Sequence, residues 1–310
     1  MRHPILVWFR RDLRLSDHPA LHAAAQSGAP IIPVFIRDHS VDALGAAPKW
    51  RLGEGLGELA KNLETAGSNL VLRAGPALEV LQTLIAETGA KSVFWSRLYD
   101  PYATSRDSEI KSTLKSANID ARSFGGHLMF EPWTAETKTG GFYKVYTPFW
   151  KSLKDRNVDV PLAKPAKFPA PDTWPDSEHL DDWQLGKAMR RGASIVAQFA
   201  RVGEAAAQDR LAHFIDGIVA GYDTTRDQPW ADGTSNLSEN LALGEISPHQ
   251  CWHAGQRALQ EGKPGAETFL KELVWREFAY HLMHHTPHIL SGNWKPDWDA
   301  FPWNADGSDP

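Results

Sequence analysis

The chain has 310 residues, a length at which two moderate domains are a better expectation than one large core. Its 42% hydrophobic and 23% charged residues are ordinary globular usage, and the lack of any long apolar run argues against a membrane-spanning protein. The formal net charge of −5 excludes a general attraction to nucleic acid, so DNA binding would need a local basic patch.

Residues 1–128 alternate short β-rich runs with helical patterns. Runs such as ILVWF and IIPVFI are continuously apolar, which indicates a parallel sheet covered by helices on both faces. The predicted strands are residues 5–9, 31–36, 69–73, 92–95 and 121–124. The predicted helices of this part are residues 19–26, 49–65, 77–88 and 104–117. We therefore predict a doubly wound α/β domain over residues 1–128.

The segment after the first strand, WFRRDLRLSDHPAL, contains no glycine and so lacks the phosphate-binding fingerprint of nicotinamide enzymes. Gly53, Gly55 and Gly57 lie close together, but they fall inside a helical pattern rather than at a strand-to-helix turn. A nicotinamide-dependent enzyme is therefore disfavoured. We expect the arginines of this segment to lie at a domain interface rather than on DNA.

Residues 129–192 form a proline-rich connection with few periodic segments, which is typical of an interdomain linker. Seven basic residues lie between positions 137 and 167, against two acids. They are Lys138, Lys144, Lys151, Lys154, Arg156, Lys164 and Lys167. A solvated linker face explains this run at least as well as a nucleic-acid patch does.

From residue 193 to residue 310 the patterns become helical, which predicts an all-α domain. The predicted helices are residues 193–200, 205–214, 248–260 and 266–285. The third has the clearest start, because Ser247 can cap it, Pro248 suits its first position and Gln250 completes a capping box.

A glycine-entered run of hydroxyl and amide side chains leads toward a helix in this domain. Its members are Thr234, Ser235, Asn236, Leu237 and Ser238. Such donors, together with the positive end of a helix, can bind a pyrophosphate. An N-capped loop without a ligand is the alternative.

The helical stretch FLKELVWREFAYHLMHHTP carries a second candidate site. Spacings of three and four place Phe269, Glu272 and Arg276 on one face, with Trp275 beside it. A carboxylate and an indole in one wall could hold a flipped base, by hydrogen bonding along its edge and stacking on its plane. The alternative is an exposed Glu–Arg pair beside a core tryptophan.

Two other features predict no chemistry. His281, His284, His285 and His288 include pairs four residues apart, but the HExxH pattern and a following carboxylate are absent, so we predict no metal site. The single cysteine, Cys251, cannot form an internal disulfide and fits a reducing compartment, for which we expect the cytoplasm.

Taken together, the motifs WFRRDLRLSDHPAL, TSNLS, GEIS and ELVWREF resemble those of the DNA photolyase/cryptochrome family. Their order and spacing run the length of the chain, so the match is more specific than any one motif. The sequence is most similar to cyclobutane pyrimidine dimer photolyases. The resemblance implies a Rossmann-like antenna domain, an interdomain linker over 129–192 and part of an all-α FAD-binding domain over 193–310.

The resemblance also implies cofactors and site residues. FAD would be bound by Tyr222, Thr234, Ser235, Asn236, Leu237, Ser238 and Phe269. DNA containing a pyrimidine dimer would be bound by Arg226, Glu272, Trp275 and Arg276. Trp303 would be the outermost tryptophan of a chain that reduces the flavin. The implied reaction is light-driven electron transfer from reduced FAD to the dimer, and we expect a monomer.

The sequence departs from the family where it stops at Pro310, because further flavin-domain helices should follow. The chain should therefore lack part of the flavin pocket and expose an apolar patch. A second, antenna chromophore of folate or deazaflavin type fits the family, but residues 99–110 do not reproduce the polar pair that holds a folate. Two alternatives stay open, a cryptochrome-type blue-light photoreceptor and a remnant without flavin.

Overall fold

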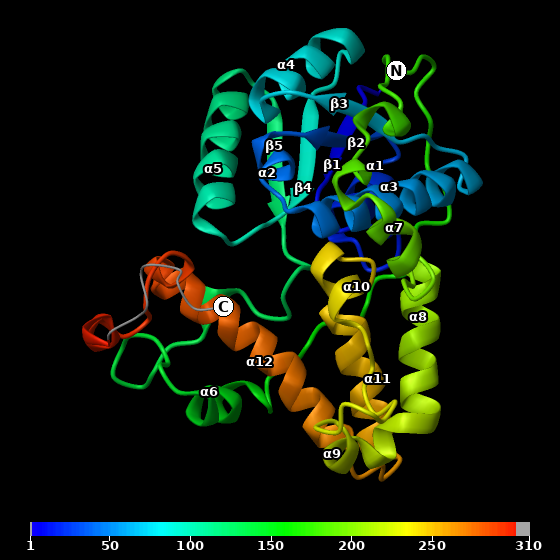
Figure 1. Ribbon diagram of the computed structural model, residues 1–310. Coiled ribbons are helices and arrows are strands. Elements are labelled where there is room, and N and C mark those ends of the chain that lie inside the picture. The colour runs from blue at the N-terminus through cyan, green and yellow to red at the C-terminus, as the bar shows by residue number, and fades with distance from the viewer. Residues whose placement is uncertain (1, 302–310) are drawn as a thin grey trace.

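The computed structural model describes residues 2–301, which form an α/β part and a helical part (Figure 1). The strands are β1 (Ile5–Phe9), β2 (Ile31–Arg37), β3 (Val71–Ala74), β4 (Ser92–Ser96) and β5 (Asp120–Phe124). All neighbouring strands are parallel, in the order β3-β2-β1-β4-β5. The order reverses between β1 and β4, so the predicted doubly wound α/β fold is confirmed.

Side chains alternate along β1 and so build a core on each face of the sheet. Ile5, Val7 and Phe9 pack on one face, whereas Leu6 and Trp8 pack on the other. The first face is covered by α1 (Pro19–Ser27) and α3 (Ala46–Thr65), and the second by α4 (Ala77–Thr88) and α5 (Pro101–Ser116). A short helix, α2 (His39–Asp42), follows β2. Both faces are buried, as the apolar runs predict.

The boundaries in the α/β part differ from the predicted ones by at most three residues. The largest differences are at the starts of α3 and α5. Helix α5 begins at Pro101 because Asp100 accepts a hydrogen bond from the Ala103 backbone N–H at 2.9 Å and caps it. Proline suits that first position, where its missing N–H costs nothing.

The proline-rich connection contains a helix that the sequence pattern does not predict, α6 (Tyr146–Leu153). Pro148 lies in its first turn, where a proline is tolerated. Phe149 and Leu153 are buried in the same core as the helical part. This stretch of the predicted linker therefore belongs to the packing of the helical part.

The helical part has the all-α character predicted for it. Its helices are α7 (Arg191–Val196), α8 (Glu204–His213), α9 (Tyr222–Thr225), α10 (Ser238–Leu243), α11 (Pro248–Gln260) and α12 (Ala266–His285). A π-helical turn, Phe214–Ile218, continues α8. Short 3₁₀ turns are Pro132–Thr134, Leu180–Trp183, Lys187–Met189, Val219–Gly221, Pro287–Leu290 and Pro296–Ala300. Among residues 2–301, no helix is long and apolar enough to cross a membrane.

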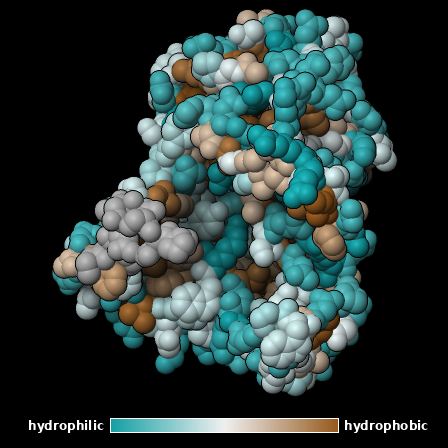
Figure 2. All heavy atoms as spheres, viewed as in Figure 1, coloured by the Kyte–Doolittle hydropathy of each residue, from teal (hydrophilic) through white to brown (hydrophobic). Residues whose placement is uncertain are grey.

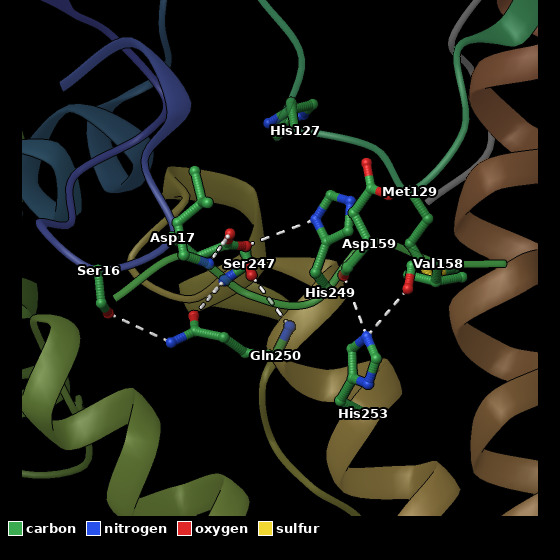
Figure 3. Close-up of polar contacts among 12 residues, drawn as sticks. Ser16, Asp17, His127, Met129, Val158, Asp159, Ser247, His249, Gln250 and His253 are labelled. Carbon is green, nitrogen blue, oxygen red and sulfur yellow. Dashed lines mark hydrogen bonds and ion pairs between the residues drawn. The ribbon is translucent and has the colours of Figure 1, made fainter. Parts of the chain in front are cut away.

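The first turn of α11 joins the two parts (Figure 3). The predicted capping box is present, because the Ser247 hydroxyl accepts from the Gln250 N–H and the Gln250 side chain accepts from the Ser247 N–H. Gln250 also donates to the hydroxyl of Ser16 at 3.2 Å. His249 lies 3.5 Å from the carboxylate of Asp17. The residues after β1 are thus held against α11.

Two buried arginines strengthen this interface. Arg14 is 1% exposed and donates to the carbonyls of Gly126 and Gly244, each at 3.0 Å. Arg51 on α3 forms a bidentate ion pair with Glu245, in which the two guanidinium nitrogens lie 2.8 and 2.5 Å from the carboxylate oxygens. The interface role predicted for the arginines after β1 is therefore confirmed for Arg14. Figure 2 shows that this face of the molecule is hollowed between the two parts.

Candidate functional site

Helix α12 presents Glu272 and Trp275 to solvent, one turn apart, and we call this surface the Glu272–Trp275 face. Trp275 is 45% exposed. Arg226, at the end of α9, donates to the Glu272 carboxylate and forms an ion pair with it. This pairing raises the pKa of Arg226. Three residues that the sequence assigns to one surface are therefore close together.

An aromatic residue that the sequence analysis missed completes this face. The ring of Tyr146 on α6 is stacked on Trp275, with centroids 3.7 Å apart and an interplanar angle of 6°. Burial and the Glu272 carboxylate raise the pKa of Tyr146, so its hydroxyl stays protonated. It donates to the Lys271 carbonyl at 2.6 Å. No local pattern could reveal this contact, because the two rings are far apart in the sequence.

Tyr222 and Phe269, two residues assigned to the flavin, meet in the core of the helical part. Their rings are edge to face, with centroids 6.2 Å apart, and both contact Phe214. They are 9% and 3% exposed. Leu237 is 2% exposed and lies in the same cluster. The loop that ends in Leu237 is thus attached to α9 and to the first half of α12.

The hydroxyl-rich run has free donors that fit a phosphate-bearing cofactor. Among residues 2–301, the hydroxyls of Ser235 and Ser238 have no hydrogen-bond partner. Asn236 has a left-handed backbone with φ of 52°, and its carbonyl accepts from Arg210 at 2.8 Å. Thr234 donates to the Asn236 side chain at 3.2 Å. Hydroxyls are groups that bind phosphate oxygens, whereas the nearby guanidinium of Arg210 is paired with Glu239.

Gly233 fixes where this run begins. A Cβ at this position would lie 2.7 Å from the Thr225 hydroxyl oxygen and 2.9 Å from the Thr225 carbonyl oxygen. Only glycine allows so close an approach to α9 without a shift. The hydroxyl-rich run therefore starts beside α9. This helix carries Tyr222 and is directly followed by Arg226.

One predicted residue, Arg276, is not brought to this face. Arg276 donates to the His127 carbonyl at 2.8 Å and lies 5.1 Å from the ring centre of Tyr280, so it faces the start of the connection. Its role in DNA binding stays a prediction. Trp303 lies outside the described residues.

The histidines at the end of α12 serve packing. His281 accepts from the Tyr143 N–H at 3.1 Å and donates to the Pro132 carbonyl at 3.0 Å, so both ring nitrogens are used. His285 is stacked on Phe142. In the described part of the chain, no group of three or more His, Cys, Asp or Glu residues could hold a metal ion.

A second candidate site is a cavity of about 330 Å³ at the carboxyl ends of the strands. Its lining includes Trp8, Phe35, Leu52, Tyr102 and Leu243. It lies where the strand order reverses, which is the usual ligand position in such sheets. Sequence reasoning missed it, because its lining comes from segments spread between β1 and α10.

Two arginines in the wall of this cavity are paired with carboxylates. Arg10 binds Asp107 and Arg106 binds Asp38, each at 2.6 Å. Both guanidinium groups also lie over the Trp8 ring, at 4.4 and 4.9 Å from its centre. A wall of neutralised arginines stacked on an indole offers a flat surface, which suits a planar ring system.

The fold and these two sites define a class. A doubly wound sheet with a cavity at its switch point is joined to a helical part, in which a carboxylate–tryptophan face adjoins a hydroxyl-rich loop. This arrangement agrees with the resemblance of the sequence to the class of proteins that comprises photolyases and cryptochromes.

Comparison with known proteins places the chain within that class. Residues 5–172 match the family described as DNA photolyase, and residues 269–309 match the FAD binding domain of DNA photolyase. The first match covers more than half of the chain. The chain therefore belongs to the DNA photolyase family.

The relatives are longer than this chain. A deoxyribodipyrimidine photo-lyase from Agrobacterium fabrum is 44% identical over 305 residues, which cover 98% of this chain and 64% of the relative. The crystal structure of a bacterial class III photolyase from Agrobacterium tumefaciens is 43% identical with a TM-score of 0.95, over 99% of this chain and 64% of that one. Cryptochrome-2 of Arabidopsis thaliana is 29% identical, over 97% of this chain and 52% of the relative. This chain thus spans just under two thirds of the photolyases' length.

Proposed function

We propose that this protein binds FAD and uses light to repair cyclobutane pyrimidine dimers in DNA. The observation that carries the proposal is the Glu272–Trp275 face, in which a carboxylate paired with Arg226 lies beside an exposed indole. Relatives named deoxyribodipyrimidine photo-lyase support it. The substrate class is DNA that contains a pyrimidine dimer.

The flavin would be held by the residues that the resemblance indicates. The free hydroxyls of Ser235 and Ser238 would donate to its phosphates, with Thr234, Asn236 and Leu237 shaping the run. Tyr222 and Phe269 would support it from the core below. When bound, reduced FAD supplies an electron under light. Trp303 would be the outermost tryptophan of the chain that reduces the flavin.

The residues of this chain would bind and orient the lesion. Trp275 would stack on an extruded pyrimidine, and Glu272 would hydrogen-bond along its edge. The ion pair between Arg226 and Glu272 would fix the group on the pyrimidine edge before the reaction, so that the site need not reorganise, and the positive charge of Arg226 would lie near the negative charge that forms on the dimer. Arg226 would hold Glu272 in position and bind a DNA phosphate with its remaining N–H groups. Arg276 would contact DNA only if its hydrogen bond to the His127 carbonyl were broken.

A cryptochrome-type photoreceptor is the second candidate. The more distant identity to Cryptochrome-2 makes it the weaker one. A photoreceptor has no need of a carboxylate and an indole that match a flipped base. The two candidates differ in whether illumination removes dimers from DNA.

The test is dimer loss under illumination by the FAD-loaded protein. We expect Glu272→Gln to lower the repair rate on the order of 100-fold, because it breaks the ion pair that fixes both Arg226 and the group on the pyrimidine edge. Trp275→Ala should weaken dimer binding by about 5- to 150-fold, the range for losing one stacked base. Glu267→Gln is the matched control, since Glu267 is an exposed carboxylate on the same helix, paired with Lys271. Normal repair by both site variants would contradict the proposal.

We further propose that the switch-point cavity binds an antenna chromophore with a planar ring system. The paired arginines on Trp8 support a flat ligand, and they do not distinguish a folate from a deazaflavin. Ala103→Phe places a ring in the wall of the 330 Å³ cavity and should abolish binding of both pigments. Ser105→Phe, on the exposed side of α5, should bind them as the parent does. Retained binding in Ala103→Phe would refute this site.

The expected monomeric state and cytoplasmic location stay predictions. Light scattering of the purified protein tests the first, and cell fractionation tests the second. Burial raises the pKa of the Cys251 thiol to about 12, which makes the thiol unreactive.

A further inference from the structure

The indole of Trp275 is covered on one side only. Tyr146 lies parallel to it, with ring centroids 3.7 Å apart. Phe278 meets its edge, with centroids 5.8 Å apart and an interplanar angle of 74°. Trp275 is nevertheless 45% exposed. The face opposite Tyr146 is therefore open to a ligand.

Tyr146 is held in place by contacts of its own. Its hydroxyl donates to the Lys271 carbonyl at 2.6 Å, one turn before Trp275 on α12. Its ring also meets Phe278 edge to face, with centroids 5.9 Å apart. Helix α6 is anchored by Phe149 and Leu153, which are 2% and 0% exposed. Tyr146 cannot swing away from the indole without breaking these contacts.

The geometry of the pair is that of stacked flat rings. Aromatic pairs in proteins usually adopt offset or edge-to-face arrangements, with ring centroids about 4.5–7 Å apart. A parallel pair at 3.7 Å instead has the spacing of a base stack. A pyrimidine on the open face of Trp275 would extend this stack to three rings.

We propose that Tyr146 is a positioning residue, which holds the indole of Trp275 so that its open face receives the extruded pyrimidine. This inference rests on the proposed repair function and deepens it. It gives the proline-rich connection a part in lesion recognition, because α6 carries Tyr146 to α12. Tyr146 acts through Trp275 and does not itself touch the DNA.

The test is a double-mutant cycle read out as binding in the dark. Affinities for an oligonucleotide duplex with one thymine dimer and for its undamaged copy are measured by fluorescence anisotropy. The variants are Tyr146→Leu, Tyr146→Phe, Trp275→Ala and the double variant Tyr146→Leu/Trp275→Ala. Tyr143→Leu is the matched control, because Tyr143 lies in the same connection and its ring contacts Phe149 and His281.

We expect Tyr146→Leu to weaken dimer binding by about 2- to 12-fold, the value of one aromatic pair. Binding of undamaged DNA should not change. Tyr146→Phe keeps the ring and should lose less than Tyr146→Leu does. In the Trp275→Ala background, Tyr146→Leu should have no further effect, because the residue through which it acts is absent. Tyr143→Leu should bind both duplexes as the parent does.

Three results would overturn the inference. An equal loss from Tyr146→Leu with and without Trp275 would show a role independent of the indole. Tighter dimer binding in Tyr146→Leu would show that the ring occupies the place of the base. An equal loss in Tyr143→Leu would show a general effect of weakening the connection. Normal dimer binding by Trp275→Ala alone would instead contradict the proposed function itself. The failure of the proposed function can thus be distinguished from the failure of the positioning role of Tyr146.

Discussion

Replacing Glu277 with glutamine should change how the stability of the protein depends on pH. The Glu277 side chain on α12 is buried, and its Oε2 accepts from the Met129 and Phe130 N–H groups, each at 3.1 Å. Its Oε1 lies 3.7 Å from Arg276 and has no hydrogen bond among residues 2–301. Burial raises the pKa of this carboxyl to about 7, against the lowering effect of Arg276.

The sign follows from which state holds the proton. Between pH 4.5 and 7 the folded protein keeps the Glu277 proton while the unfolded chain has lost it, so the free energy of unfolding falls as pH rises. The rise of the Glu277 pKa from 4.5 in the unfolded chain to about 7 in the folded protein corresponds to a loss of about 3 kcal/mol in the free energy of unfolding over this pH range. Glutamine has the same shape, accepts both N–H bonds and carries no charge. The free energy of unfolding of Glu277→Gln, relative to that of the parent, should therefore increase by about 3 kcal/mol between pH 4.5 and pH 8.

The assay is urea unfolding of the parent and Glu277→Gln at several pH values. Glu267→Gln serves as the control, because Glu267 is half exposed and its replacement should show no such trend. A difference between Glu277→Gln and the parent that stays constant from pH 4.5 to pH 8 would refute the reasoning.

Three further changes have expected outcomes. Glu245→Ala leaves Arg51 buried without its two-pronged partner, so we expect a loss of about 3–5 kcal/mol in urea unfolding; an effect below about 1 kcal/mol would contradict this. Gly244→Ala should lower the melting temperature more than any surface substitution, because Gly244 has φ of 67° and a Cβ there would lie 2.2 Å from the Arg11 carbonyl oxygen; a melting temperature equal to that of the parent would argue against the close packing of the two parts. Ser247→Ala removes the cap of α11 and should cost about 1 kcal/mol, whereas Ser247→Asp should retain most of the stability.

The sheet and the long helices could be predicted because their signals are local. The apolar run Ile5–Phe9 predicts a strand buried on both faces, and the structure confirms it. The capping box of Ser247 and Gln250 marks the start of α11 to the residue. Helical spacing within α12 correctly places Glu272 beside Trp275, but Phe269, which it puts on the same face, is 3% exposed in the core.

The features that escaped prediction depend on partners far apart in the sequence. Tyr146 gives no sign of its position on Trp275, because its helix lies in a segment whose prolines indicate a linker. Arg276 shares a helical face with Glu272, but the carbonyl of His127 attracts it to the other part. The switch-point cavity appears only when β1, β2, α5 and α10 are brought together.

The account depends most on an extruded pyrimidine reaching the open side of Trp275, and base unstacking measures this directly. A fluorescent adenine analogue placed next to the lesion in duplex DNA brightens when its neighbours leave the stack. With the parent protein, dark binding of the damaged duplex should produce this increase, and Trp275→Ala at saturating concentration should not. A damaged duplex that is fully bound by the parent with no change in fluorescence would contradict the account.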